Sequence, residues 1–415
     1  MNKMPSVILL AHALLGLGAA PLPAQTPTPI STPELPATPL PSVVQPTPTP
    51  TFGDNWTEVL PDRRVTFRLM APKANRAAVV VGTKGGVDEV EGRMSAEMAK
   101  GPDGLWTLTL GPFEPSLYEY RFDLDGVMVP DTGNPMPKPQ RHVNTSLLLI
   151  PGDPPDFLDS QTGAHGTIRD ETYYSTVLGK NRQVLVYTPP AYDRTRAPLP
   201  VLYLYHGFWD TRYSWVTEGR LTQILDNLLA QGKAVPMVVV VPEAHALAPE
   251  PTQAITGNSL TDVQPYLLRN QRAVDEELFH DIIPFIQAHY NVSEEPRERA
   301  VAGLSMGGLQ SIETGIVHLG YFEWVGAFSP GVLPHAFSED FQNALKDANR
   351  INQTLRLFEI ITGDKDPRVA GPNTEFDAEL TRLNIRHIYT IVPGTHSMFV
   401  WRPALAKFLQ QIFAR

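Results

Sequence analysis

The segment over residues 303–307 reads Gly-Leu-Ser-Met-Gly and fits the pattern G-x-S-x-G. In this pattern a serine lies on a sharp turn between a strand and a helix, where side chains on the neighbouring positions would collide. An apolar run precedes Ser305, and Gly308 adds another small residue after it. The turn would also place the Met306 amide at a helix N-terminus, where a developing oxyanion is favoured. The segment therefore predicts Ser305 as a nucleophile for acyl transfer and Met306 as one oxyanion donor.

A serine hydroxyl is a poor nucleophile until a base takes its proton, and a carboxylate must hold that base. Around a turn of this kind the acid and then the histidine follow the serine along the chain. Of the histidines after Ser305, only His396 falls in a segment that reads as a loop between a late strand and the last helix. We therefore predict His396 as the base. Asp364 and Asp366 are both candidates for the acid, and their spacing does not distinguish them.

A second oxyanion donor is expected from the loop after an earlier strand, which here begins His-Gly-Phe. Gly207 permits the turn, and the Phe208 amide would be the donor. His206 is interpreted as a structural hydrogen-bonding residue rather than as a base. Three further residues are candidates for lining an acyl or sugar pocket, although a tryptophan that opens a helix more often packs in a core: Trp215, Glu243 and His245.

The elements that must position these residues follow from the alternation of apolar strands with amphipathic helices after residue 160. The expected strands are RQVLVYTPP, LPVLYLYHGF, PMVVVVPEAHA, RAVAGLS, WVGAFSP, LRLFEIITGD and RHIYTIVPG. The expected helices are RLTQILDNLLAQGKA, VDEELFHDIIPFIQAHY, MGGLQSIETGIVHL, NTEFDAELTRLN and RPALAKFLQQIFA. This alternation predicts an α/β domain over residues 160–415, with a mostly parallel sheet covered by helices on both faces. Sites in such sheets lie at the carboxyl ends of the strands, where His396 is expected.

Residues 55–152 instead show short runs in which apolar and polar residues alternate, such as RVTFRLMAP, LWTLTLGPF and LYEYRFDLDGVMV. This alternation, an Asp125-Gly126 hairpin signal and the lack of a convincing helix predict a small antiparallel β-sandwich. Four aromatic residues are candidates for stacking on sugars, but a place in the core is favoured because the last three share one strand face with Leu124: Trp106, Tyr118, Tyr120 and Phe122.

The N-terminal segments predict export. Residues 1–24 contain one lysine, then an apolar run, then small residues, which is the layout of a secretory signal peptide. A retained membrane anchor is the alternative, although the run is shorter than the roughly 20 residues that spanning requires. Residues 25–54 alternate proline with threonine and serine and predict a semi-rigid linker, with a proline-rich ligand for a partner domain as the alternative. We expect an extracellular or periplasmic protein.

The composition of the 415-residue chain limits its partners. The formal net charge of −10 argues against nucleic acid and anionic membranes, because both require clustered lysine and arginine. The chain has no cysteine, which excludes cysteine nucleophiles, thiolate metal sites and disulfides. No metal or organic cofactor is implied.

Four segments, in their order along the chain, resemble the esterase D group of α/β hydrolases: PVLYLYHGF, RAVAGLSMGGLQS, GDKD and GTHSMFVWRPAL. This group includes the feruloyl and acetylxylan esterases of carbohydrate esterase family 1 and the relatives of enterochelin esterase. The resemblance covers roughly residues 160–415 and implies an α/β-hydrolase fold and ester hydrolysis. Feruloyl esterases of this type carry a Gly-x-x-Asp turn whose last residue is the triad acid, which implies Asp366. Their His…Trp ending implies a substrate-side place for Trp401 beside His396.

Residues 55–152 resemble an immunoglobulin-like early-set module akin to a family-48 carbohydrate-binding module, which implies glycan binding or a structural or lid role. Together these resemblances imply a secreted serine esterase, of the feruloyl type, that acts on plant cell-wall polysaccharide. Acetylxylan esterase and siderophore esterase remain alternatives, although anionic ferric catecholates would favour a cationic surface rather than a net charge of −10. A non-catalytic glycan-binding protein on a hydrolase scaffold is a further alternative.

Overall fold

The computed structural model describes residues 57–83, 85–87, 92–141, 143–153, 156–247, 260–332 and 337–414. The predicted signal peptide and linker lie outside these residues, so both stay predictions. In the described part of the chain, no helix has the length and apolar character needed to cross a membrane.

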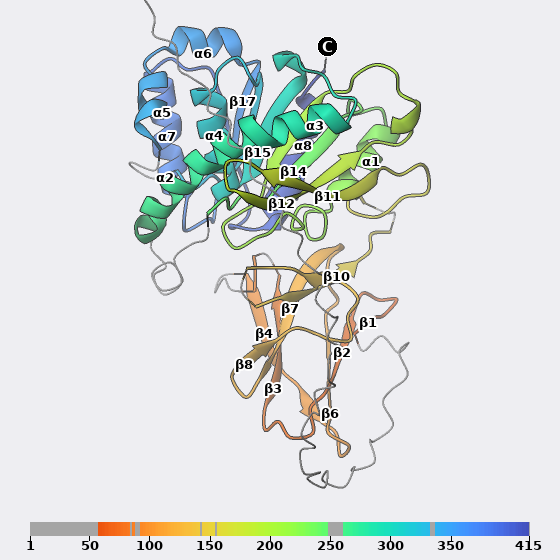
Figure 1. Cartoon of the computed structure of the whole chain (residues 1–415). Helices are drawn as coiled ribbons and strands as arrows, with labels where there is room; N and C mark the ends of the chain where they lie inside the picture. The colour runs from red at the N-terminus through yellow and green to blue at the C-terminus, as the bar shows by residue number, and fades with distance from the viewer. Residues whose placement is uncertain are drawn as a thin grey trace, which may run out of the picture. The chain divides into compact units, whose positions relative to one another are not determined.

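Residues 58–150 form two antiparallel sheets (Figure 1). One sheet has the order β1 (Glu58–Val59), β2 (Val65–Met70), β6 (Leu105–Leu110) and β5 (Ala99–Lys100). The other has the order β4 (Arg93–Glu97), β3 (Ala77–Gly82), β7 (Ser116–Leu124), β10 (Thr145–Ile150) and β9 (Pro137–Lys138), and β8 (Val127–Val129) pairs with β7. The predicted hairpin joins β7 to β8, and both turn residues, Asp125 and Gly126, have positive φ angles.

The four aromatic residues considered for sugar stacking belong to the core between these two sheets. Tyr120 and Phe122 are fully buried, and Tyr118 and Trp106 are 4% and 5% exposed. The indole nitrogen of Trp106 donates a hydrogen bond to the backbone carbonyl of Ala71 at 2.9 Å. Sugar stacking by these four rings is therefore wrong, because a ring that stacks on a glycan needs an accessible face.

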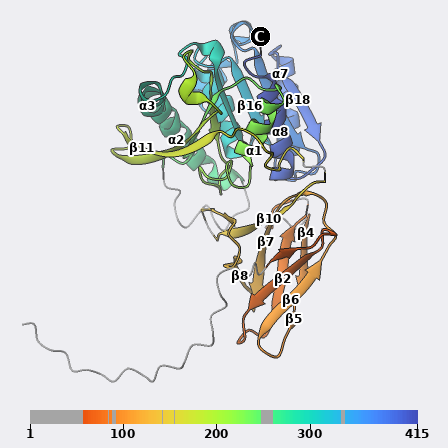
Figure 2. The ribbon, with the colours of Figure 1, turned by 90° about the vertical axis from the view of Figure 1, so that its right-hand side faces the viewer.

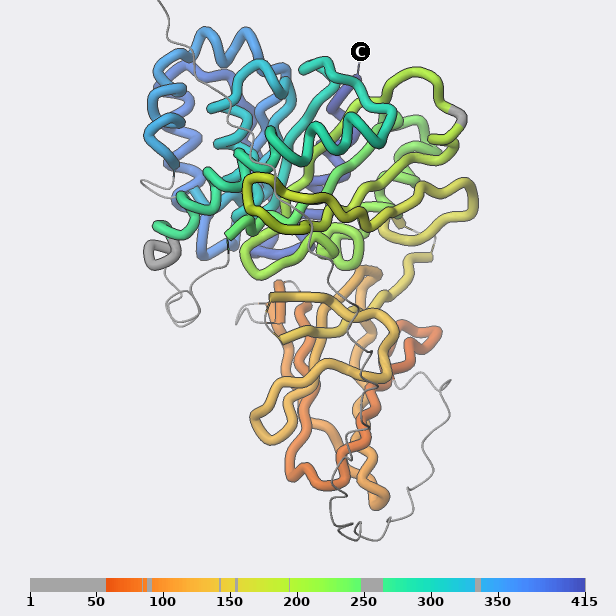
Figure 3. Tube along the Cα trace, viewed as in Figure 1, coloured from red at the N-terminus to blue at the C-terminus, as the bar shows by residue number. Residues whose placement is uncertain are grey.

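Residues 167–392 supply a single eight-stranded sheet. Its order is β11 (Thr167–Ser175), β12 (Lys180–Thr188), β14 (Val238–Pro242), β13 (Val201–Tyr205), β15 (Arg299–Leu304), β16 (Trp324–Phe328), β17 (Leu357–Gly363) and β18 (Ile388–Val392). The strands from β14 to β18 in this order run parallel, whereas β12 is antiparallel to both of its neighbours. Figure 3 follows the path of the chain as a tube coloured by residue number. The predicted mostly parallel sheet is confirmed. The sequence reading did not recognise β11, whose run TIRDETYYS contains few apolar residues.

Helices cover both faces of this sheet, as predicted (Figure 2). The helices are α1 (Leu221–Ala230), α2 (Leu260–Glu277), α3 (Ile283–His289), α4 (Met306–Val317), α5 (Glu339–Ala344), α6 (Ala348–Thr354), α7 (Ala370–Arg382) and α8 (Met398–Gln411), with a π-helical turn over Leu278–Ile282. Helices α1 and α8 pack on one face, and residues from α2 to α7 pack on the other.

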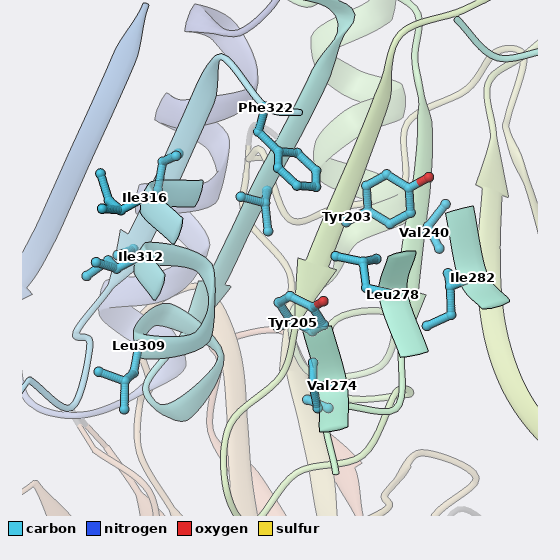
Figure 4. Packing of buried hydrophobic residues seen from close by; sticks show 14 of the residues in the cluster. Tyr203, Tyr205, Val240, Val274, Leu278, Ile282, Leu309, Ile312, Ile316 and Phe322 are labelled. Carbon is cyan, nitrogen blue, oxygen red and sulfur yellow. The ribbon is translucent and has the colours of Figure 1, made fainter. Parts of the chain in front are cut away.

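Successive residues of the central strands supply the two cores in alternation. Tyr203 and Tyr205 of β13 point to one core, and Leu202 and Leu204 point to the other. Figure 4 shows the first core, where Tyr205 lies among side chains from other elements. A strand buried on both faces reads as an unbroken apolar run, which is why these strands were visible in the sequence.

Several helices differ from the sequence expectations. Helix α2 begins at Leu260, fourteen residues before the predicted segment that starts at Val274. Helix α8 begins at Met398, four residues before the predicted segment, and contains Pro403. The short helices α5 and α6 were not predicted, although each begins after a side chain that caps it, Ser338 and Asp347 respectively. Helices this short contain too few apolar residues for a clear helical period.

A buried acid on α4 is expected to make stability depend on pH. Glu313 is 4% exposed, and its Oε1 atom accepts a hydrogen bond from the Ser338 amide at 3.2 Å. Burial raises the pKa of Glu313 from 4.5 to about 7, and the hydrogen bond from Ser338 offsets this only in part. Because the folded-state pKa is raised, the stabilisation is fully present below pH 4.5 and is lost as the pH rises through 7.

We therefore expect Glu313→Gln, which keeps the acceptor oxygen, to become more stable relative to wild type at pH 8 than at pH 5. The gain between the two pH values is expected to be about 1–3 kcal/mol in the free energy of unfolding. Urea unfolding at each pH measures it. Glu375→Gln, which changes an exposed acid on α7, is the control. An equal gain in both variants would contradict the assignment to Glu313.

Candidate active site

Ser305 lies on the turn between β15 and α4, and its backbone is strained. Its φ and ψ angles are 52° and −116°, which costs a residue with a side chain about 1–3 kcal/mol. A Cβ atom on Gly303 would lie 2.4 Å from the carbonyl group of Gly307, and a Cβ on Gly307 would lie 2.6 Å from the backbone oxygens of Tyr205 and His206. Both glycines of the motif are therefore required by contact.

Ser305, His396 and Asp366 lie in a hydrogen-bonded line at the carboxyl ends of three strands. The Oγ atom of Ser305 is 2.9 Å from Nε2 of His396, and Nδ1 of His396 is 2.6 Å from Oδ2 of Asp366. A carboxylate only accepts, so Nδ1 carries the proton and Nε2 is free to accept one from the serine hydroxyl. The side chains of His396 and Asp366 are 7% and 0% exposed, which limits competition from water.

The structure separates the two candidate acids. The Oδ1 atom of Asp366 accepts hydrogen bonds from the amides of Arg368 and Val369 at 3.1 and 3.3 Å. Burial alone would raise the pKa of Asp366, but the hydrogen bond from His396 and the backbone amides outweigh it and lower the pKa below 3.8. Asp364 is exposed and accepts a hydrogen bond from the Gly394 amide at 2.8 Å. Only Asp366 of the pair is hydrogen-bonded to His396.

The loop that begins with His206 passes directly beside the serine. A Cβ atom on Gly207 would lie 3.6 Å from the Cβ of Ser305. The loop is closed by Asp210, whose side chain accepts from the Gly207 amide at 3.2 Å and whose own amide donates to the Gly207 carbonyl at 3.3 Å. Among the described residues the Phe208 amide has no acceptor, and the Met306 amide begins α4 directly after Ser305. Both predicted donors thus belong to turns that meet at Ser305.

Trp215 does not line a pocket, and that prediction is corrected. Its side chain is fully buried, and its indole nitrogen donates to the carbonyl of Tyr205 at 2.9 Å. Its ring packs edge-on against Phe328, with 6.1 Å between the ring centroids. Trp215 is a core residue that ties the end of β13 to the segment before α1.

His245 also differs from the prediction, because it lies beneath the His-Gly-Phe loop. It is 3% exposed, its Nε2 atom is 2.7 Å from the carbonyl oxygen of Phe208, and its Nδ1 atom is hydrogen-bonded to the Tyr266 hydroxyl. Burial lowers the pKa of His245 to about 2, so the ring is neutral at physiological pH. With both ring nitrogens engaged by protein groups, His245 has none left for substrate.

Glu243 faces the other histidine of this loop. One carboxylate oxygen is 3.0 Å from Nε2 of His206. Burial would raise the pKa of Glu243, but His206 outweighs it and lowers the pKa to about 2. Glu243 therefore carries a negative charge that faces His206. These contacts do not support the prediction that Glu243 lines a substrate pocket.

Trp401 packs against the predicted base. Its ring is perpendicular to that of His396, with 4.9 Å between the centroids. Trp401 is 7% exposed, and its indole nitrogen has no hydrogen-bond partner among the described residues. Trp401 therefore lies beside His396, and its role in substrate binding stays a prediction.

The sequence reading did not find Tyr266 of α2, which contacts the rings of both Phe208 and His245. No motif surrounds this residue, so only the fold brings it to the site.

A cavity of about 260 Å³ lies away from these residues, because its lining does not include Ser305, Asp366 or His396. The cavity is lined by His165, Thr167, Arg169, Thr188, Pro189, Ala191, Tyr192 and Asp193.

Comparison with known proteins agrees with this geometry. A family model described as "Putative esterase" matches residues 175–412, which is more than half of the chain. The chain belongs to this esterase family. The matched region contains Ser305, Asp366 and His396.

Individual relatives and solved structures are also similar to this chain. An endo-1,4-beta-xylanase/feruloyl esterase of Xylanibacter ruminicola is 26% identical over 372 residues, which cover 87% of this chain and 46% of that protein. The chain thus spans about half the length of this curated relative. A solved ferulic acid esterase from Anaeromyces mucronatus is 26% identical, with a TM-score of 0.52 over 62% of this chain and 94% of that one.

A third comparison concerns the fold alone. The enterochelin esterase of Shigella flexneri is 17% identical, with a TM-score of 0.60 over 85% of this chain and 94% of that one. The matched region therefore has an α/β-hydrolase-like fold.

The two acids of the turn after β17 offer a direct test of the esterase site. Asp366→Asn removes the charge that holds the His396 ring, so we expect kcat to fall about 10³–10⁴-fold. Asp364→Asn changes an exposed acid of the same turn and is expected to lower kcat by less than about tenfold. Turnover of 4-nitrophenyl acetate measures both. Equal losses in the two variants would show that Asp366 is not the acid.

Proposed function

We propose that the protein is a serine carboxylic-ester hydrolase that works through an acyl-enzyme. One observation carries the proposal: the line from the Ser305 hydroxyl through His396 to Asp366, with distances of 2.9 and 2.6 Å. Ion pairs between histidine and aspartate are common in proteins. A serine at a strained strand-to-helix turn that completes the line is the arrangement required for acyl transfer.

The reaction follows from the positions of these groups. Ser305 attacks the ester carbonyl while His396 takes the hydroxyl proton and then gives it to the leaving alkoxide. Asp366 stabilises the imidazolium that forms. The amides of Phe208 and Met306 bind the oxyanion, and the loss of one such donor typically costs about 3–4 kcal/mol of transition-state stabilisation. Water then cleaves the acyl-enzyme by the same route.

The proposed substrate is a feruloyl ester, or another hydroxycinnamoyl ester, on plant cell-wall polysaccharide. The names of the Xylanibacter relative and of the Anaeromyces structure, each 26% identical, support this acyl group. Phe208 and Trp209, both partly exposed, stack edge-to-face with 4.9 Å between centroids close to Ser305. Such aromatic surface suits a phenyl-containing acyl group.

Two other ester substrates are compatible with the same machinery. Acetylxylan would need only a small acyl pocket. A catecholate siderophore is supported by the shared fold of the Shigella enterochelin esterase over 85% of this chain. The net charge of −10 disfavours an anionic ferric siderophore. A non-catalytic glycan-binding role would leave the aligned Ser305, His396 and Asp366 without a purpose.

Export and glycan binding complete the proposal. The layout of residues 1–24 supports secretion to the periplasm or outside the cell. The two-sheet region over residues 58–150 is proposed as an immunoglobulin-like module that holds polysaccharide, in the manner of a carbohydrate-binding module. Since its core aromatic rings are buried, any glycan contact would come from other residues.

The nucleophile can be tested with a fluorophosphonate probe, which reacts covalently with activated serines. We expect the probe to label Ser305, as located by peptide mass spectrometry, and Ser305→Ala to lower kcat on aryl esters at least about 10⁴-fold. Ser311→Ala, on α4, is the control, and the probe is expected to label Ser305 in this variant as it does in wild type. Unlabelled wild-type protein, together with full activity in Ser305→Ala, would remove the nucleophile assignment.

The acyl group can be tested with three substrates. We expect kcat/KM for methyl ferulate to exceed that for acetylated xylan and for a catecholate trilactone by at least about tenfold, a difference of about 1.4 kcal/mol in transition-state binding. A preference of similar size for the trilactone would replace the plant-wall substrate with a siderophore ester.

A further inference from the structure

Two buried histidines hold the backbone on either side of Phe208. His206, directly after β13, is fully buried, and its Nδ1 atom is 2.8 Å from the carbonyl oxygen of Gly207. His245, after β14, has its Nε2 atom 2.7 Å from the carbonyl oxygen of Phe208. The two carbonyls that flank the predicted oxyanion donor are therefore each bonded to an imidazole.

The tautomers of both rings follow from their partners. A carbonyl oxygen only accepts, so Nδ1 of His206 and Nε2 of His245 each carry a proton. The neutral His245 ring then has a bare Nδ1 atom beside the Tyr266 hydroxyl, whose single proton is also directed at the Leu247 carbonyl oxygen, 3.0 Å away. On the far side of the His206 ring, Nε2 lies 3.0 Å from Glu243 and 2.9 Å from the Ala244 amide. Each ring is therefore held at both of its nitrogens.

These contacts fix a direction as well as a position. A peptide group is planar and trans, so its carbonyl and its N–H point in opposite directions. The Gly207 carbonyl and the Phe208 N–H belong to one peptide group. When His206 holds that carbonyl on one side, the Phe208 N–H must point to the other side. The Phe208 amide has no acceptor among the described residues, and the loop passes beside Ser305.

We propose that His206 and His245 are positioning residues that aim the Phe208 amide at the oxyanion formed on Ser305. His206 sets the plane of the peptide group that contains this amide, and His245 keeps the following peptide group from turning. The Ala244 amide holds the His206 ring at its other nitrogen, and the Tyr266 hydroxyl lies against the other nitrogen of the His245 ring. The inference rests on the proposed ester hydrolysis and assigns a task within it to histidines that do not exchange a proton with substrate.

The expected kinetic signature is specific. An oxyanion exists only near the transition state, so an amide that points elsewhere lowers kcat and leaves KM nearly unchanged. A residue that only supports the fold would instead lower the melting temperature or alter both constants.

Paired amide substitutions test the geometry. The nitrogen of an asparagine side chain is attached to Cγ, as Nδ1 of histidine is, whereas the nitrogen of glutamine is one bond further out, as Nε2 is. His206→Asn and His245→Gln therefore retain the donor at the required place, and His206→Gln and His245→Asn displace it. We expect His206→Asn and His245→Gln to keep kcat within about tenfold of wild type. We expect His206→Gln and His245→Asn to lower kcat about 10²–10³-fold, with KM changed less than about threefold.

Phenylboronic acid gives a second readout, because its tetrahedral adduct with a serine oxygen places negative charge where the oxyanion forms. Its inhibition constant is expected to rise only in His206→Gln and His245→Asn. Melting temperatures identify variants that do not fold. If a variant of one histidine does not fold, the two variants of the other histidine test the inference. Equal losses of kcat in the two variants of each histidine, or an effect confined to KM, would overturn the inference.

The wild-type protein keeps this test separate from that of the proposed function. Turnover of aryl esters and fluorophosphonate labelling by wild type test ester hydrolysis itself. The ratio of kcat between the matched substitutions tests only the aim of the Phe208 amide. Active wild-type enzyme with no difference inside either pair would retain the proposed function and remove the role of the histidines.

Discussion

The close approach of two backbone segments at the site is the constraint on which the rest depends. The start of α4 lies against the end of β13 so tightly that a single Cβ on Gly307 would lie 2.6 Å from two carbonyl oxygens. This contact places the nucleophile turn and the loop after β13 side by side. A peptide group has no rotatable side chain, so donors on these two turns keep their positions through the reaction. The cost is a strained Ser305, which the surrounding packing must maintain.

Buried polar groups on both sides of Ser305 hold one another by hydrogen bonds. His396 is held by Asp366, and Asp366 by the amides of its own turn. On the other side of the serine, buried histidines hold the carbonyls of the His-Gly-Phe loop. Almost every one of these polar atoms has a partner, as a buried site requires, because an unpaired polar group costs about 1–3 kcal/mol. The site is therefore stiff before substrate arrives.

The parts of the structure that the sequence predicted are those with local causes. Unbroken apolar runs mark strands buried on both faces, and the glycines around Ser305 mark a turn that excludes side chains. Asp364 and Asp366 could not be separated by spacing, because which acid reaches His396 depends on how the chain turns after β17. His245 was misplaced for a similar reason: a polar residue after a buried strand can face substrate or the underside of a neighbouring loop. Tyr266 has no local signal, since only tertiary packing brings α2 to the site.

The perpendicular packing of Trp401 on His396 has a consequence for the alcohol half of the ester. Nδ1 is bonded to Asp366 and the indole of Trp401 packs against the imidazole, so both contacts favour a single orientation of the ring during turnover. The proton taken from Ser305 must leave from the same Nε2 atom in the same place. The departing oxygen therefore has to come to the base. The enzyme would then distinguish esters by where their alcohol part places that oxygen, as well as by how readily it leaves.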